Sequence, residues 1–167
     1  MPREIKNILF VCFGNICRSP FAEGLFTKLA PQAEQKDLLA DSAGLFALPG
    51  NSATSLAQRV AIEHDVDLSR HEAKPVSKSL VKWSDLILVM EKSHIKTLLE
   101  TFPEATDKTR LIRHYSRFGS KQRGIADPYG LQYEAYRFCF LDIEDAISGL
   151  IRNLSDGRVD DSERKDY

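Results

Sequence analysis

The strongest constraint on the fold is a run of five consecutive apolar residues, Leu86-Ile87-Leu88-Val89-Met90. Both faces of a strand with this sequence are apolar, which predicts a central position in a parallel sheet covered on both sides. Ile8-Leu9-Phe10-Val11 is a similar run near the N-terminus. Two shorter apolar segments, 38–40 and Leu111-Ile112, predict a second and a fourth strand.

Stretches with the apolar spacing of helices separate these runs. The predicted helices cover about 20–30, about 52–65, a short segment capped by Ser77, a segment that stops at Pro103, and a long segment from Tyr136 to about 154. Strands that alternate with helices predict an α/β fold with one parallel sheet. The 167 residues fit a single domain, expected over 1–154, with a polar and flexible tail at 155–167.

The expected crossovers also predict where a functional site lies. Right-handed crossovers place the carboxyl ends of parallel strands along one edge of the sheet, where ligands bind in such folds. The loops that should meet at this edge are 12–19, 43–51, the turn near Glu91, and 113–130. Chemically active residues in these four loops are therefore expected to lie close together.

Charge and cysteine content exclude several classes of protein. The formal net charge is −1 and the basic residues do not cluster, which argues against nucleic acid as the main partner. Three cysteines, an odd number, do not suit a secreted disulfide framework and favour a reducing compartment. No apolar segment approaches the ~18 residues of a transmembrane helix, and the N-terminus lacks a signal-peptide pattern. These features predict a cytoplasmic protein without direct membrane insertion.

The segment 11–20, Val-Cys-Phe-Gly-Asn-Ile-Cys-Arg-Ser-Pro, follows the first strand and opens the first helix. Five residues separate Cys12 from Arg18, so the backbone can curl into a ring of inward-facing N–H groups that holds a phosphate without a metal. Gly14 and Asn15 are expected to adopt the unusual backbone conformations of such a ring. The predicted phosphate-binding residues are Phe13, Gly14, Asn15, Ile16, Cys17, Arg18 and Ser19.

This ring is also expected to activate Cys12. A helix N-terminus and a nearby cation favour a thiolate, and Ser19 could donate a further hydrogen bond to the sulfur. The planar guanidinium of Arg18 can bind two phosphoryl oxygens at once. Cys12 and Cys17 could instead be small buried residues, and a bare Cys-x5-Arg arises by chance. The surrounding strand, Gly-Asn, Arg-Ser-Pro and helix favour the phosphate site.

At this point the sequence resembles the low-molecular-weight protein tyrosine phosphatases, over roughly residues 5–154. The likeness rests on 11–20, Asp41-Ser42-Ala43-Gly44, His71-Glu72-Ala73-Lys74 and Asp127-Pro128-Tyr129-Gly130. The stretch 90–95 resembles the bacterial branch associated with capsule and exopolysaccharide production. The resemblance implies a three-layer fold, with a four-stranded parallel sheet of order 2-1-3-4 and helices on both faces.

The resemblance also implies a catalytic mechanism without a cofactor or a metal. Cys12 would attack phosphorus, Arg18 would stabilise the transferring phosphoryl group, and Asp127 would protonate the leaving phenolate and then activate water. Inorganic phosphate would be the product. An Asp-Pro pair by itself is usually only a turn, but Asp127 lies in a loop expected at the same sheet edge as Cys12.

Further roles are implied by the same resemblance. A supporting hydrogen-bond network would consist of Asn15, Ser19, Ser42 and His71, although a histidine before a turn can also be an ordinary surface residue. Cys17 would be a redox partner that forms a reversible disulfide with Cys12. The substrate ring would lie at a rim made of Phe13, Leu48 and Tyr129, which could alternatively be ordinary loop packing.

Two positions depart from the family pattern. Glu91 stands where the family has Asp, so the support for Arg18 from this site is open, and Lys74 replaces Arg. The resemblance to the exopolysaccharide branch suggests a membrane-bound bacterial tyrosine autokinase as the phosphotyrosine protein substrate.

Four other functions fit the sequence less well. An arsenate reductase needs relay cysteines near the third strand, and 78–103 contains none. Protein arginine phosphatases carry Thr where this chain has Ile16, so the tyrosine branch is favoured. A non-catalytic phosphoprotein reader needs no acid such as Asp127. A metal hydrolase is disfavoured because the four histidines show no ligand spacing.

Overall fold

Four parallel strands form the sheet in the computed structural model, which describes residues 4–35 and 37–156. The strands are β1 (Asn7–Cys12), β2 (Leu39–Gly44), β3 (Leu86–Val89) and β4 (Thr109–Leu111). Their order is β2-β1-β3-β4, with every neighbouring pair parallel, so the predicted sheet is confirmed. One detail of the prediction is wrong. β4 ends at Leu111, and Ile112 already begins a 3₁₀ helix, η3 (Ile112–Tyr115).

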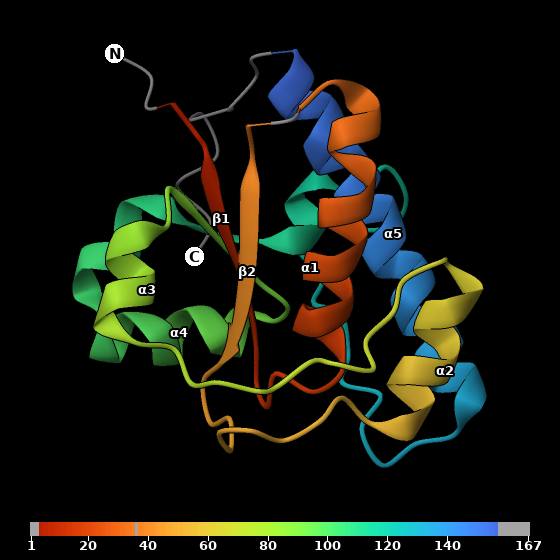
Figure 1. The fold of residues 1–167 in the computed structure, drawn as a ribbon. Helices are drawn as coiled ribbons and strands as arrows, with labels where there is room; N and C mark the ends of the chain where they lie inside the picture. The colour runs from red at the N-terminus through yellow and green to blue at the C-terminus, as the bar shows by residue number, and fades with distance from the viewer. Residues whose placement is uncertain (1–3, 36, 157–167) are drawn as a thin grey trace.

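Helices cover both faces of this sheet, as predicted (Figure 1). The α-helices are α1 (Arg18–Leu29), α2 (Ser55–Glu63), α3 (Lys78–Trp83), α4 (Lys92–Thr101) and α5 (Tyr133–Ser155), and the other two 3₁₀ helices in the described ranges are η1 (Pro31–Ala33) and η2 (Pro103–Lys108). α1, α2 and α5 lie on one side, and α3 and α4 lie on the other. Ser77 caps α3 as expected, because its side chain accepts a hydrogen bond from the Leu80 amide at 3.2 Å.

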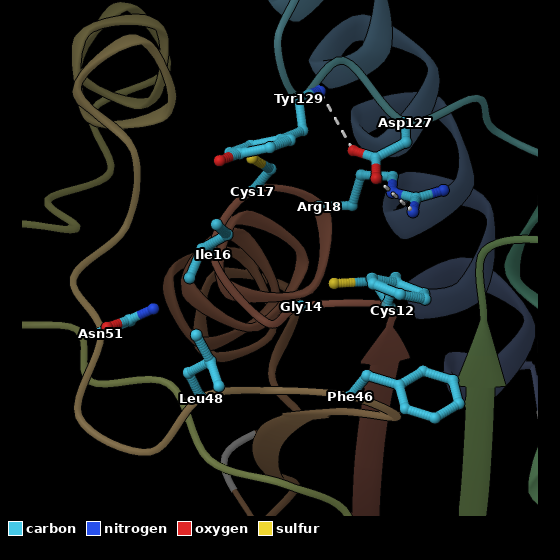
Figure 2. Close-up of a pocket in the computed structure, with 11 residues that line it drawn as sticks. Cys12, Gly14, Ile16, Cys17, Arg18, Phe46, Leu48, Asn51, Asp127 and Tyr129 are labelled. Carbon is cyan, nitrogen blue, oxygen red and sulfur yellow. Dashed lines mark hydrogen bonds and ion pairs between the residues drawn. The ribbon is translucent and has the colours of Figure 1, made fainter.

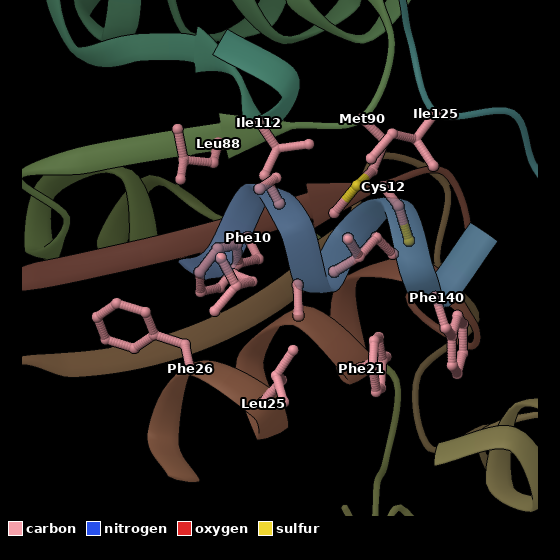
Figure 3. Close-up of a cluster of buried hydrophobic side chains, with 14 of the residues drawn as sticks. Phe10, Cys12, Phe21, Leu25, Phe26, Leu88, Met90, Ile112, Ile125 and Phe140 are labelled. Atoms are coloured by element: carbon pink, nitrogen blue, oxygen red, sulfur yellow. The ribbon is translucent and has the colours of Figure 1, made fainter. Parts of the chain in front are cut away.

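The alternation of side chains along β1 explains the three layers. Ile8 and Phe10 pack with α1 and α5, whereas Leu9 and Val11 pack with α3 and α4. The larger cluster contains Phe21 of α1 stacked on Phe140 of α5, with ring centroids 4.0 Å apart (Figure 3). Since both faces of the central strands are covered, successive residues of a strand are apolar, which is the pattern that the sequence showed.

The edge of the sheet that carries the site is fixed by close backbone packing. A Cβ atom added at Gly149 of α5 would lie 1.8 Å from the Tyr115 carbonyl oxygen, so only glycine lets η3 rest on this helix. That contact holds the start of the loop that leads from β4 to Asp127. Gly44, the last residue of β2, is also restricted, because its added Cβ would lie 2.8 Å from the Phe13 carbonyl oxygen.

Two further findings concern the chain ends and membranes. α5 continues to Ser155, and most of the predicted tail at 155–167 falls outside the described residues, which stop at 156. Within the described ranges, none of the helices has both the length and the apolar character needed to cross a bilayer.

Candidate active site

Cys12 is the last residue of β1, and the loop that follows it returns to the N-terminus of α1 at Arg18. Asn15 is the left-handed residue of this loop, with φ 56°, and its amide donates a hydrogen bond to the Cys12 Sγ at 3.3 Å. The left-handed conformation predicted for Asn15 is therefore present. Gly14 differs from the prediction, because its φ lies outside the left-handed region and an added Cβ would contact only the Ile16 side chain, at 3.6 Å.

The sulfur of Cys12 is buried and receives a second polar contact from Ser19. The Cys12 Sγ lies 2.9 Å from the Ser19 Oγ, and the Asn15 Nδ2 donates to that same oxygen at 2.8 Å. The Ser19 hydroxyl keeps one proton to donate, and the Ala43 carbonyl oxygen is more distant, at 3.5 Å. The shorter contact places the Ser19 hydroxyl where it can donate its proton to the sulfur.

The four residues of the predicted network meet beneath the loop. Asn15, fully buried, also donates from Nδ2 to the Ser42 Oγ at 3.0 Å, and its Oδ1 accepts from the Lys74 amide at 3.0 Å. His71 Nε2 lies 2.6 Å from the Asn15 carbonyl oxygen, so Nε2 carries a proton and donates it. Every polar atom of the Asn15 side chain therefore has a hydrogen-bond partner. Hydrogen bonds to Ser42, His71 and Lys74 hold the left-handed turn.

Sequence reasoning missed Glu23 of α1 in this network. The Ser42 hydroxyl donates to the Glu23 Oε1 at 2.7 Å, and burial raises the pKa of this carboxyl group, partly offset by that hydrogen bond. The Lys74 departure does not disturb the network. Its amide supports Asn15, and its ammonium group lies 2.5 Å from Asp41 Oδ1. Glu23 is distant from Ser42 in the sequence. Only the packing of α1 against β2 brings the two side chains together.

Arg18 is buried, with 1% of its surface exposed, and one edge of its guanidinium is already occupied. Its Nη1 donates to Glu91 Oε2 at 2.9 Å and to the Ile125 carbonyl oxygen at 2.7 Å. Burial lowers the pKa of Arg18, but Cys12, Asp127 and Glu91 together outweigh it and raise the pKa. Nε has no hydrogen-bond partner among the described residues and is available for an anion, whereas Nη2 is 3.4 Å from Asp127 Oδ2.

Glu91 answers the question that the sequence left open about support for Arg18. It follows β3 and also lies 3.1 Å from Nε2 of the buried His94. Burial and the nearby Arg18 lower the pKa of His94. The longer Glu side chain therefore reaches the guanidinium despite replacing Asp. Sequence reasoning missed His94 because nothing in the helical pattern of α4 distinguishes it from a surface residue.

Asp127 lies at the mouth of the site, on the loop after β4 (Figure 2). Its Oδ1 accepts a hydrogen bond from the Tyr129 amide at 3.1 Å, and its Oδ2 is 3.4 Å from Arg18 Nη2. The first contact makes an Asx turn, which fixes the direction of the carboxyl group. With 40% of its side chain exposed, Asp127 faces both the pocket and water, as an acid and base in turnover must.

A pocket of about 210 Å³ opens above Cys12. Its lining residues are Cys12, Phe13, Gly14, Ile16, Cys17, Arg18, Phe46, Leu48, Asn51, Asp127 and Tyr129. The structure brings the predicted rim residues Phe13, Leu48 and Tyr129 to its mouth, where all three are half-exposed or more. Phe46 is an exposed fourth apolar residue that sequence reasoning missed, although it lies two positions before Leu48.

Cys17 and Cys139 are free thiols with different surroundings. The Cys17 Sγ lies 3.5 Å from the Tyr136 hydroxyl and 3.6 Å from the Thr54 hydroxyl, and burial raises its pKa. Cys139, on α5, faces the core, where burial raises its pKa strongly. Among the described residues, no group of three His, Cys, Asp or Glu side chains could hold a metal ion.

Comparisons with known proteins agree with this geometry. Residues 7–159 match the family model described as low molecular weight phosphotyrosine protein phosphatase. The chain is 39% identical to the probable low molecular weight protein-tyrosine-phosphatase AmsI of Erwinia amylovora, over 90% of this chain and 99% of the relative. It is 41% identical to the phosphatase Wzb of Escherichia coli K12, over 83% and 88% of the two chains.

A relative with a different named activity also matches. The protein-arginine-phosphatase of Geobacillus stearothermophilus is 36% identical over 89% of this chain and 95% of its own length. Solved structures do not separate the two groups. The AmsI crystal structure superposes with a TM-score of 0.80 over 89% of this chain and 92% of its own, at 38% identity. An arginine phosphatase structure from Geobacillus stearothermophilus gives 0.81 over 91% and 94%, at 32% identity.

Proposed function

Because this chain belongs to the low molecular weight phosphotyrosine protein phosphatase family, we propose that it hydrolyses phosphotyrosine in proteins, with Cys12, Arg18 and Asp127 as its catalytic residues. One observation carries the assignment. The sulfur of Cys12 lies at the floor of a pocket that also contains the unoccupied Nε edge of Arg18 and, at its mouth, the carboxyl group of Asp127.

In the first step, the Cys12 thiolate attacks phosphorus and forms an S–P bond. The bond between phosphorus and the tyrosine oxygen breaks, and protonated Asp127 gives its proton to the leaving phenolate. Arg18 binds two equatorial oxygens through Nε and Nη2, and the amides of the loop 13–19 bind the remaining charge. Catalysis by alignment and charge stabilisation is what phosphoryl transfer requires of a protein.

In the second step, water attacks the cysteinyl-phosphate. Asp127, now a carboxylate, takes the proton from the water, the S–P bond breaks, and the electron pair returns to sulfur. Inorganic phosphate leaves and the thiolate is restored. The hydrogen bond from Ser19 and the amide of Asn15 stabilise this sulfur anion as a leaving group, so they act in both steps.

The pocket walls favour phosphotyrosine over the alternative substrates. Ile16 has no hydroxyl group to bind a guanidinium, and the exposed side chains at the mouth, Phe13, Leu48 and Tyr129, are apolar or aromatic and suit a phenyl ring. Phosphoserine is too short to pass this rim and reach the sulfur. The residues at the mouth of the pocket thus determine substrate specificity, whereas those at the floor bind the phosphate group of any ester in the same way.

The test is hydrolysis of matched peptides that carry phosphotyrosine, phosphoarginine or phosphoserine, without added metal. The expected order of kcat/KM is phosphotyrosine far above the other two, and Cys12→Ser should abolish turnover with all of them. Faster hydrolysis of phosphoarginine would transfer the chain to the arginine-phosphatase group. Turnover that survives Cys12→Ser would refute the thiolate mechanism.

We further propose a cytoplasmic location and, as physiological substrate, the tyrosine-rich tail of a membrane-bound tyrosine autokinase that controls exopolysaccharide or capsule production. The relatives AmsI and Wzb support this choice of branch. Asp127→Ala should trap the substrate, because the phenolate then leaves without a proton. We expect phosphorylated kinase to be recovered from cell lysate on Asp127→Ala and not on Arg18→Ala. Failure to recover it on either variant would contradict the assignment.

A further inference from the structure

An aromatic pair extends the pocket beyond the space that a phosphotyrosine ring needs. The rings of Phe13 and Phe46 have centroids 5.1 Å apart and planes inclined by 40°. Phe13 is 50% exposed and Phe46 is 61% exposed, although both line the pocket. Large aromatic side chains that remain exposed together beside a binding pocket are typical of a recognition surface.

The backbone fixes the position of this pair. The Leu45 amide donates to the Cys12 carbonyl oxygen and the Phe46 amide donates to the Phe13 carbonyl oxygen, both at 2.9 Å. These bonds continue the β1–β2 pairing past the ends of the strands. Gly44 permits this approach, as the close contact described for its missing Cβ requires. The backbone positions of Phe13 and Phe46 are therefore held before a substrate arrives, and their rings already contact each other, which lowers the entropic cost of binding.

The charges around the pair restrict what it can bind. Among the described residues that line the pocket, Arg18 is the only cation, and it is buried at the floor. Asp127, exposed at the mouth, is itself an acid and offers no cationic partner to an acidic side chain. An acidic side chain near the rim would thus lose water without gaining a partner, whereas an apolar or aromatic side chain would cover both phenyl rings.

We propose that Phe13 and Phe46 form a subsite for an apolar or aromatic side chain directly next to the phosphotyrosine in the substrate. Phe13 belongs both to the catalytic pocket and to this pair, so the occupant lies within about one residue, or 3.3–3.6 Å of chain, of the phosphotyrosine. The inference rests on the proposed phosphotyrosine activity and names the sequence context that this activity favours.

The experiment compares two pairs of phosphotyrosine peptides that differ in one residue, Phe or Glu, placed either before or after the phosphotyrosine. In one of the two pairs, the wild type should favour Phe over Glu by about 10-fold in kcat/KM, mainly through KM. Phe46→Ala should reduce that preference to about 2-fold, and Phe46→Leu should keep an intermediate preference. Phe118→Ala, which removes a phenyl ring that is 69% exposed and does not line the pocket, should leave the ratio unchanged.

The outcomes separate this subsite from the function on which it rests. If neither peptide of either pair is hydrolysed by the wild type, the proposed function fails. If peptides are hydrolysed with ratios near one, or if the preference for Phe survives Phe46→Ala, the subsite is refuted while the function stands. Thermal melting of both Phe46 variants verifies folding, and the exposure of this side chain leads us to expect melts like the wild type.

Discussion

The floor and the rim of the pocket have opposite distributions of polarity. The floor, taken here with the network beneath it, is buried and polar: Asn15, Ser19 and Ser42 have at most 1% of their surface exposed. The rim is exposed and apolar: Phe46, Leu48 and Tyr129 each have more than 60% exposed. Ordinary folding places these residue types the other way round. Each inversion costs stability, so both mark places where function determines the residue.

The two regions also tolerate change differently. Floor residues are joined by directional hydrogen bonds in a buried space, so removing one partner leaves another unsatisfied. Rim residues make few directional contacts, and their interaction with a substrate scales with apolar area. Substitutions in the floor should therefore reduce kcat and often stability, whereas substitutions in the rim should change KM and substrate choice.

Arg18→Lys should give the largest effect in this comparison. An ammonium group cannot bind two phosphoryl oxygens while it also contacts Glu91 and the Ile125 carbonyl oxygen, as the guanidinium fork can. We expect kcat to fall about 10²- to 10³-fold. Steady-state kinetics on p-nitrophenyl phosphate measures it, and a loss confined to KM would show that Arg18 acts only in ground-state binding.

Asn15→Ala should come next. It leaves the Ser19 and Ser42 hydroxyls and the Lys74 amide without their shared partner. The free energy of unfolding should fall by about 2–3 kcal/mol. A misplaced loop should lower kcat by up to about 10²-fold. Urea denaturation measures the change in the free energy of unfolding, and steady-state kinetics measures the change in kcat. Wild-type stability with a reduced kcat would show that the network positions the loop but does not stabilise the fold.

Glu91→Gln tests the charge beside the guanidinium. The amide oxygen can still accept from Arg18, but the bond is then no longer between two charges, so we expect kcat/KM to fall about 10-fold. Glu144→Gln is a matched change on the surface of α5, where the carboxylate contacts His64, and it should leave kcat/KM unchanged. Equal effects of both variants would remove the role that we assign to Glu91.

The buried His94 should make the stability of the protein depend on pH. Burial and Arg18 lower its pKa in the folded state, while the unfolded chain takes up a proton near the ordinary value of about 6.5. Stability should therefore be highest above pH 6.5 and fall on acidification, by up to about 1.4 kcal/mol per pH unit from this group. His94→Asn should remove that component in urea denaturation between pH 7.5 and 5.5. Parallel pH profiles of the two proteins would contradict it.

Tyr129→Ala should give the smallest effect, because it removes apolar area from the rim and leaves the backbone amide that contacts Asp127. We expect KM for a phosphotyrosine peptide to rise about 3- to 10-fold with little change in kcat. The initial-rate dependence on peptide concentration measures both constants. A large fall in kcat would mean that the phenol ring, and not only its area, contributes to the chemistry.

The sequence determined a large part of this molecule by itself. The run 86–90 and the apolar segment 8–11 predicted central parallel strands, because a strand covered on both faces must be apolar throughout. The spacing of Cys12 and Arg18 between a strand and a helix predicted the loop, since local backbone geometry follows from local sequence. Asn15 was likewise expected to accept a left-handed conformation.

Only the tertiary structure decided which distant side chains complete the site. Glu23, Phe46 and His94 carry no local signal, because their roles depend on partners on other elements. The same holds for the orientation of Arg18, whose Nη1 is held by Glu91 and Ile125 from the loops after β3 and β4. Short-range sequence patterns fix secondary structure, but hydrogen bonds and ring contacts between loops arise only when the sheet brings the loops to one edge.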